Sequence, residues 1–135
     1  MLTLLHPPMI TGLTAGILGL LYVLLSVLVV VNRGSSKVTL GDGDGDHAAL
    51  LMAIRAHANF AEYTPYILVL LAYMELVMGQ NLFVQSEAAA LILARVLHAM
   101  GMYAGGTNPM RAMGFLLTMV VLFMLSGGAV LTVLG

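Results

Sequence analysis

Two short groups of charged and amide side chains stand inside otherwise apolar segments. Arg55, Asn59 and Glu62 are spaced i, i+4 and i+7, and Arg95 and His98 are three residues apart. At about 100° per helical residue, each group lies along one stripe of a helix. Two polar stripes at matching depth in a membrane are expected to face one another, within one subunit or between two. Their side-chain types, donors above all, predict a ligand site.

The balance of charge decides between a ligand site and a closed ion pair. Arg55, Arg95 and Arg111 outnumber the single nearby carboxylate, Glu62. An ion pair of Glu62 with Arg55 or Arg95 that only holds two helices together remains an alternative, because such pairs do form for packing alone. An ionised side chain inside a span costs at least ~2.5–3.5 kcal/mol. The excess of cations therefore favours an anionic ligand.

The composition identifies the medium around these side chains. Of 135 residues, 61% are hydrophobic and 8% are charged, and the mean hydropathy is +1.03. Such values are typical of an integral membrane protein. The net charge of −1 gives no general attraction to nucleic acid, so none is expected as a partner. The absence of cysteine excludes disulfides, thiolate metal sites and a thiol nucleophile supplied by the protein.

Four segments are long and apolar enough to cross ~30 Å of hydrocarbon as helices. They are residues 9–31, 48–78, 86–104 and 111–134. The fold class predicted is all-α, with residues 1–135 forming a single bundle of four transmembrane helices. Residues 1–8 contain no Lys or Arg and precede a long apolar run, which favours a retained span over a signal peptide.

The polar segment 32–47 is expected to be a loop between the first two spans. Its glycine–aspartate alternation over residues 41–46 resembles part of a calcium loop. An EF-hand that began at Asp42 would need a glutamate at position 53, which is Ala53. We therefore expect no metal here and treat the segment as solvated, with Asp46 as a candidate N-cap of the following helix.

The basic residues indicate how the chain is oriented. All five lie in or near the loops that follow the first and third spans: Arg33, Lys37, Arg55, Arg95 and Arg111. The positive-inside rule makes that side cytoplasmic, so both termini are expected outside the cytoplasm. Glu75 and Glu87 are expected toward the opposite surface.

Small residues are expected to allow close helix packing. They are Gly12, Gly16 and Gly19 in the first span and Gly127 and Gly128 in the fourth.

Three motifs resemble one known family. Residues 55–65, which run Arg-Ala-His-Ala-Asn-Phe-Ala-Glu-Tyr-Thr-Pro, are similar to the helix II signature of the membrane-associated proteins in eicosanoid and glutathione metabolism, or MAPEG family. Arg95 and His98 resemble the helix III signature of its microsomal glutathione transferase and prostaglandin E synthase branch. Arg111 matches that branch's arginine just inside helix IV. The chain looks like a bacterial-type member.

The resemblance implies a homotrimer in the bacterial inner membrane, with glutathione bound between subunits near the cytoplasmic face. The glutathione-binding residues it implies are Arg33, Arg55, Asn59, Glu62, Tyr63, Arg95 and His98. The implied catalytic residue is Arg111, which would stabilise the thiolate. The activity implied is a glutathione-dependent transferase or peroxidase that acts on a lipophilic second substrate arriving from membrane lipid, with glutathione as thiol co-substrate and no metal.

Two positions depart from the branch's pattern. Met102 stands where a pocket tyrosine is common, although Tyr103 is adjacent, and Ala112 stands where the prostaglandin enzyme has a serine. Both departures disfavour the prostaglandin reaction and leave general conjugation or peroxide reduction open. Another low-molecular-weight thiol is also an open choice.

Two other functions remain as alternatives. One is a small multidrug-type proton-coupled exporter with Glu62 as its proton site, although the excess of arginines would repel cationic drugs. The other is a non-catalytic trimeric membrane protein of the same fold.

Overall fold

The chain folds into four helices of membrane-spanning length. The computed structural model describes residues 7–135. Most of residues 1–8, the segment for which the sequence disfavours a signal peptide, therefore lies outside the described residues. The helices are α1 (Met9–Ser36), α2 (Ala48–Met78), α3 (Leu82–Tyr103) and α4 (Pro109–Leu134). All four are long and apolar enough to cross a membrane. The predicted all-α class with four membrane-length helices is thus confirmed.

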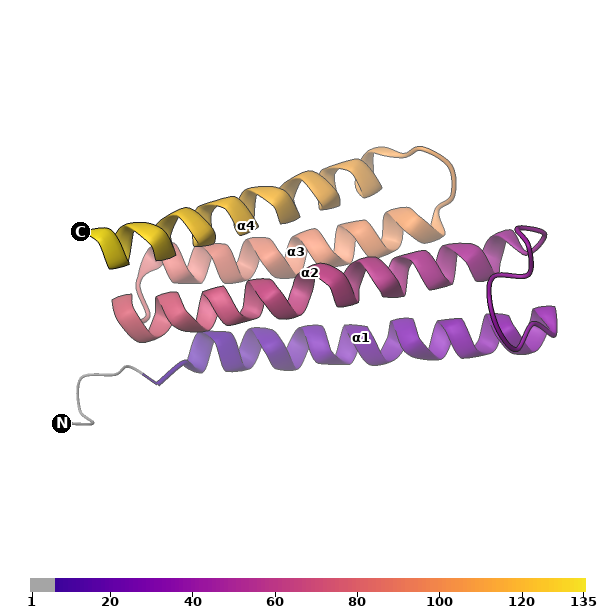
Figure 1. Cartoon of the computed structure of the whole chain (residues 1–135), viewed down its shortest axis with the longest axis horizontal. Coiled ribbons are helices and arrows are strands. Elements are labelled where there is room, and N and C mark those ends of the chain that lie inside the picture. The colour runs from indigo at the N-terminus through magenta and orange to yellow at the C-terminus, as the bar shows by residue number, and fades with distance from the viewer. Residues whose placement is uncertain (1–6) are drawn as a thin grey trace.

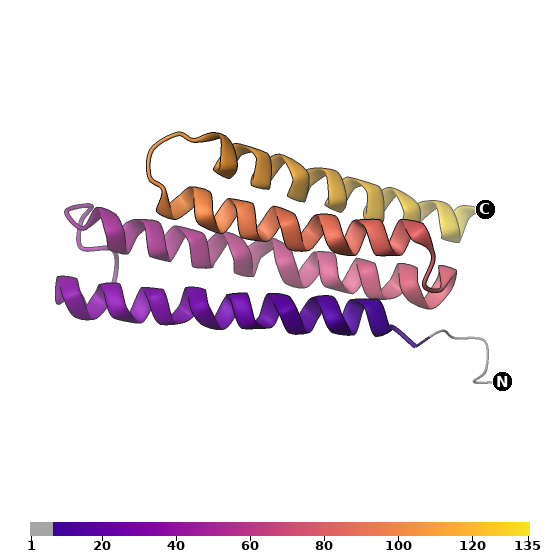
Figure 2. The ribbon, with the colours of Figure 1, turned by 180° about the vertical axis from the view of Figure 1, so that it is seen from behind.

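The helices run antiparallel, side by side (Figure 1). The α1–α2 and α3–α4 loops lie at one end of the bundle, which we call the loop end. The view from behind shows the start of α1 and the end of α4 together at the other end (Figure 2). Helix α2 contacts all three others, while α1 and α4 do not contact each other within the described residues. The shared core is apolar and includes Leu18, Leu25, Phe60, Ile67, Leu71, Met74, Leu91, Val121 and Leu125.

Local capping sets where two helices begin. The Asn81 side chain accepts a hydrogen bond from the Val84 nitrogen at 2.9 Å, so α3 begins at Leu82 rather than near residue 86. Helix α2 has His47 at its N-cap position and no side-chain capping bond. The prediction that Asp46 caps α2 is therefore wrong. Helix α1 continues past residue 31 to Ser36, which shortens the polar loop.

The closest glycine packing occurs at positions other than those predicted. A Cβ atom at Gly12, Gly16 or Gly19 would meet nothing within 4 Å, and the same holds at Gly127; only Gly128 lies against a neighbour, the Met74 side chain. Within one chain, the prediction of close packing by the α1 glycines is wrong. The close approach is between α3 and α4, at Gly101 and Gly114. A Cβ at either would overlap backbone atoms of the other helix.

Glu75 and Glu87 lie at the end opposite the loop end, on the side expected for them, and both are buried. Glu75 is fully buried and accepts hydrogen bonds from the first turn of α1. Glu87 is 9% exposed, and its Oε2 atom has no hydrogen-bond partner in the described part of the chain. Both side chains therefore belong to the interior of the bundle.

Candidate functional site

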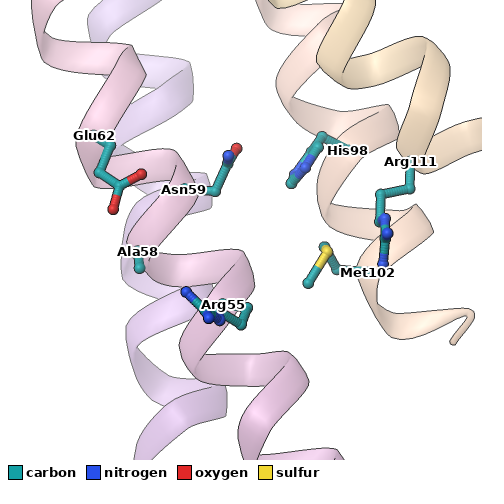
Figure 3. A pocket seen from close by; sticks show the side chains of 7 residues that line it. All are labelled: Arg55, Ala58, Asn59, Glu62, His98, Met102 and Arg111. Carbon is teal, nitrogen blue, oxygen red and sulfur yellow. The ribbon is translucent and has the colours of Figure 1, made fainter. Parts of the chain in front are cut away.

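A polar cavity of about 300 Å³ opens between α2 on one side and α3 and α4 on the other, toward the loop end. Its lining residues are Arg55, Ala58, Asn59, Glu62, His98, Met102 and Arg111. Figure 3 shows Asn59 reaching from α2 toward His98 on α3, with Arg111 alongside on α4. Five of the eight residues predicted for the site therefore line one cavity. The two polar stripes face one another within a single chain.

The α2 wall carries charges of both signs. Arg55 and Glu62 are exposed, and Asn59 between them is half-buried. Their i, i+4, i+7 spacing places all three on the cavity side of α2. The amide oxygen of Asn59 accepts a hydrogen bond from Arg95 Nη2 at 2.7 Å. Arg95 thus pairs with a neutral amide, and not with Glu62 as the structural ion-pair alternative supposes.

Arg95 lies behind this wall. Its side chain is 1% exposed, and its guanidinium carbon is 5.7 Å from the centre of the Phe60 ring. Its Nε and Nη1 atoms are buried without a hydrogen-bond partner among residues 7–135. The guanidinium therefore contacts α2 through Asn59 and Phe60, and is not part of the cavity lining.

The opposite wall depends on the start of α4. The Asn108 Oδ1 atom accepts from the Arg111 backbone nitrogen at 3.0 Å, while its Nδ2 donates to the Gly101 carbonyl oxygen at 2.6 Å. The absent side chains of Gly101 and Gly114 let α4 approach α3 at His98. Together these contacts set the half-buried Arg111 beside the buried His98. The sequence analysis missed Asn108, although Asn-Pro before an apolar run is a helix-start signal.

A second cavity of about 340 Å³ shares Arg111 and His98 with the first. The rest of its lining comes from Thr107, Asn108, Ala112 and Phe115. Ala112 is exposed and Phe115 is 42% exposed, so this cavity opens on the outer side of α4. The Arg111 side chain thus borders both the polar cavity and a second, more apolar cavity.

Two predicted site residues lie elsewhere. Arg33 donates to the Gly41 carbonyl oxygen at 2.9 Å and closes the α1–α2 loop. Tyr63 is half-buried and meets Phe115 edge-on, with 6.1 Å between ring centres. Neither residue lines the polar cavity of its own chain. Tyr103, adjacent to Met102, lines a separate cavity with Asn32.

The chemistry of the polar cavity follows from its charges. Two guanidinium groups, of Arg55 and Arg111, and one carboxylate, of Glu62, face it. This set provides donors for two anionic groups and an acceptor for one ammonium. Within residues 7–135 no cluster of three histidine or carboxylate side chains is arranged to hold a metal ion.

Comparison with known proteins identifies the family of the chain. The family model described as MAPEG family matches residues 11–131. Two similar relatives are both named Inner membrane protein YecN, from the K12 and O6:H1 (CFT073) strains of Escherichia coli. Each is 33% identical over 89 residues, which cover 62% of this chain and 68% of the relative. No solved structure matches the chain. The chain is an integral membrane protein, and it belongs to the MAPEG family.

Proposed function

We propose that the chain binds glutathione in the polar cavity and that Arg111 stabilises its thiolate for attack on a lipophilic electrophile. The observation that carries this proposal is the charge complement of the cavity. Arg55 and Arg111 against Glu62 leave one net positive charge. Arg55 and Glu62 can pair with a carboxylate and the ammonium of glutathione, which leaves the charge of Arg111 for the thiolate.

The spacing of the charges supports the same ligand. Arg55 and Glu62 are seven residues apart on α2, which is about 10 Å along a helix. A ligand that pairs with both must carry an anion and an ammonium at different ends, as a tripeptide does. The volume of about 300 Å³ lies at the lower end of the range typical of small-molecule sites.

Arg111 is the arginine proposed for the sulfur. A cation close to a thiol favours its ionised form and lowers the thiol pKa from about 8.5 toward neutrality. The chain has no cysteine, so the nucleophile must come with the ligand. The thiol loses its proton to solvent, the thiolate forms a sulfur–carbon bond with the electrophile, and the leaving group departs with the bonding electrons. In peroxide reduction the thiolate would instead attack one peroxide oxygen, and the O–O bond would break with its electrons leaving on the other oxygen, which takes up a proton to become an alcohol. A second glutathione thiol would then convert the sulfenic acid into glutathione disulfide and water.

The second cavity supports a lipophilic second substrate. It meets the first at Arg111 and carries the Phe115 ring and the small Ala112 side chain on its other wall. An apolar electrophile that enters along α4 would therefore reach the sulfur without crossing the polar cavity. This route explains why such an enzyme would reside in a membrane.

The assembly proposed is a homotrimer in the bacterial inner membrane. Large apolar side chains such as Leu13, Leu20 and Phe123 are exposed on α1 and α4, and the α1 glycines have no neighbour within one chain. Lipid or further copies of the chain must cover these faces. An intersubunit position for glutathione would add side chains of a second copy, Arg33 or Tyr63 among them, to the cavity described.

The exporter alternative is less well supported. Glu62 does line the cavity, as a proton site would, but Arg55 and Arg111 line it as well. Their charges would oppose entry of a cationic drug. A non-catalytic family member would keep glutathione binding without forming the thiolate.

Calorimetry on the detergent-solubilised protein separates these functions. Reduced glutathione should bind with release of protons, measured from the difference between two buffers of unlike ionisation enthalpy. S-methylglutathione, which has no thiol proton, should bind without that release. Binding of both ligands with no proton release would support the non-catalytic protein, and no binding of either would overturn the proposal.

A charge-matched pair of variants tests the cavity itself. Arg55→Gln should abolish binding, because it removes a carboxylate partner from the cavity wall. Lys37→Gln removes one positive charge at the same end of the bundle but outside the cavity, and it should bind like the parent. Equal binding by parent and Arg55→Gln would show that the ligand lies elsewhere.

A further inference from the structure

The Arg95 side chain is shielded from the cavity by Asn59. Arg95 is 1% exposed and does not line the cavity, whereas Asn59 does. One guanidinium nitrogen, Nη2, donates to Asn59 Oδ1 at 2.7 Å. A ligand in the cavity therefore meets the amide of Asn59 before it meets the guanidinium. This differs from the direct glutathione contact that the family resemblance implies for Arg95.

The pairing fixes which way the Asn59 amide is turned. A guanidinium group has donors and no acceptor, so only the oxygen of the amide can face it. The amide NH₂ group must then face the opposite way. Within residues 7–135 it donates to no side chain, and Figure 3 shows the Asn59 side chain pointing across the cavity toward His98. Asn59 thus offers the cavity a donor.

The Phe60 ring also lies close to the guanidinium group of Arg95. The guanidinium carbon lies 5.7 Å from the centre of the Phe60 ring, and Phe60 is the residue after Asn59 on α2. The attraction between a cation and an aromatic face, together with the hydrogen bond to Asn59, ties Arg95 on α3 to two successive residues of α2. The guanidinium is therefore held in one place relative to the amide.

We propose that Arg95 is a positioning residue, which turns the Asn59 amide so that its Nδ2 group donates to a carboxylate of the thiol ligand. This inference rests on the proposed function, since it assumes an anionic ligand in the cavity. Without Arg95 the amide is free to rotate and can present its oxygen to the carboxylate, which would repel it.

A double-mutant cycle on glutathione affinity tests the inference. Arg95→Met keeps a long side chain and removes every donor, and Asn59→Ala removes the amide. A hydrogen bond to a charged group of the ligand is involved, so each single variant should weaken binding roughly tenfold or more. The double variant should bind no more weakly than Asn59→Ala, because Arg95 would act only through Asn59. If the affinity loss of the double variant were the product of the two single losses, the inference would be overturned.

Arg95→Lys separates positioning from charge. An ammonium group can also donate to Asn59 Oδ1, so this variant should recover part of the affinity that Arg95→Met loses. In an Asn59→Ala background the Lys and Met variants should bind equally well. A persistent difference between them there would show that the charge at position 95 acts on the ligand by itself, which contradicts the inference.

Asn59→Asp gives a test that does not depend on the folding of an Arg95 variant. A carboxylate accepts from Arg95 and so keeps the tie between α2 and α3, but it has no donor for the ligand. We expect the folded protein to lose glutathione binding. Parental affinity in Asn59→Asp would show that the Arg95–Asn59 pair serves packing alone, and would overturn the inference.

The same experiments separate this inference from the proposed function. If the parent protein does not bind glutathione, the proposed function fails and the positioning role fails with it. If the parent binds and the cycle gives multiplied losses, only the positioning role fails. Thermal unfolding of each variant without ligand, measured in parallel, shows whether a loss of affinity comes from a loss of folded protein.

Discussion

Glu75 near the end of α2 accepts two hydrogen bonds from Thr11 in the first turn of α1, from its backbone nitrogen at 2.7 Å and its hydroxyl at 2.8 Å. The other carboxylate oxygen accepts from the Ile10 nitrogen at 2.8 Å. A carboxylate at this position satisfies backbone N–H groups that have no partner within α1 and complements the positive end of the helix dipole. A single side chain therefore joins α1 to α2 at the end opposite the cavity.

Glu75→Gln should destabilise the protein by about 2 kcal/mol, because an amide accepts at only one end and would set its NH₂ group against an N–H donor. The measurement is the free energy of unfolding in mixed micelles. Glu87→Gln is the matched control: Glu87 is also buried, but its Oε2 atom lacks a partner in the described chain. Its replacement should cost much less. Equal losses of unfolding free energy in the two variants would mean that the hydrogen bonds that Glu75 accepts from α1 do not stabilise the protein.

Gly114→Ala should push α4 away from α3 and lower stability by about 1–3 kcal/mol. The added Cβ would overlap backbone atoms of His98, and backbone cannot rotate aside as a flexible side chain does. Gly16→Ala adds the same methyl group where nothing lies within 4 Å, so it should leave the unfolding energy of a monomer unchanged or raise it slightly. A loss of stability in Gly16→Ala that depends on protein concentration would instead show that α1 packs against another copy.

The four helices could be predicted from the sequence because hydrophobic length is a strong signal, and the lipid leaves the backbone few other choices. Their ends were less predictable, since they depend on single caps. The Asn81 cap begins α3 at Leu82, and Asp46, which has the right side chain for a cap, lies just too early to serve. Capping depends on backbone geometry as well as residue type.

The cavity stripe of α2 could likewise be read from helical periodicity, because Arg55, Asn59 and Glu62 share one face in any α-helix. Contacts between helices could not be predicted from periodicity in this way. Nothing local to the sequence says that Arg95 pairs with Asn59 rather than Glu62, or that Glu75 caps a helix that begins more than sixty residues earlier. The glycine positions show the same limit: Gly114 packs closely and Gly16 does not, because only tertiary structure decides which helix face has a neighbour.

The loop end of the bundle should face the cytoplasm, because all five basic residues lie near it. The chain has no cysteine, so any labelling by a thiol reagent comes from the single cysteine that is introduced. Thr39→Cys in the exposed α1–α2 loop should be shielded from an impermeant thiol reagent in spheroplasts and become reactive after permeabilisation. Gly135→Cys at the other end should react at once. The reverse pattern would place the cavity on the outer side of the membrane.

Arg111 should act on the ionisation of the bound thiol more than on its binding. If its guanidinium pairs with sulfur, the thiol pKa is lowered in the parent, and thiolate absorbance rises at a lower pH than in Arg111→Ala. Below both pKa values the thiol is neutral in either protein, so glutathione affinity at low pH should change little. Turnover should fall roughly a hundred- to a thousandfold, the usual effect of removing a preorganised donor from a developing anion. Arg111→Lys should recover part of this, because an ammonium keeps the charge but reaches a different point.

The measurement is the ultraviolet absorbance of the thiolate, titrated against pH under saturating glutathione. An identical titration in parent and Arg111→Ala would remove Arg111 from this role and leave His98, which borders both cavities, as the next candidate.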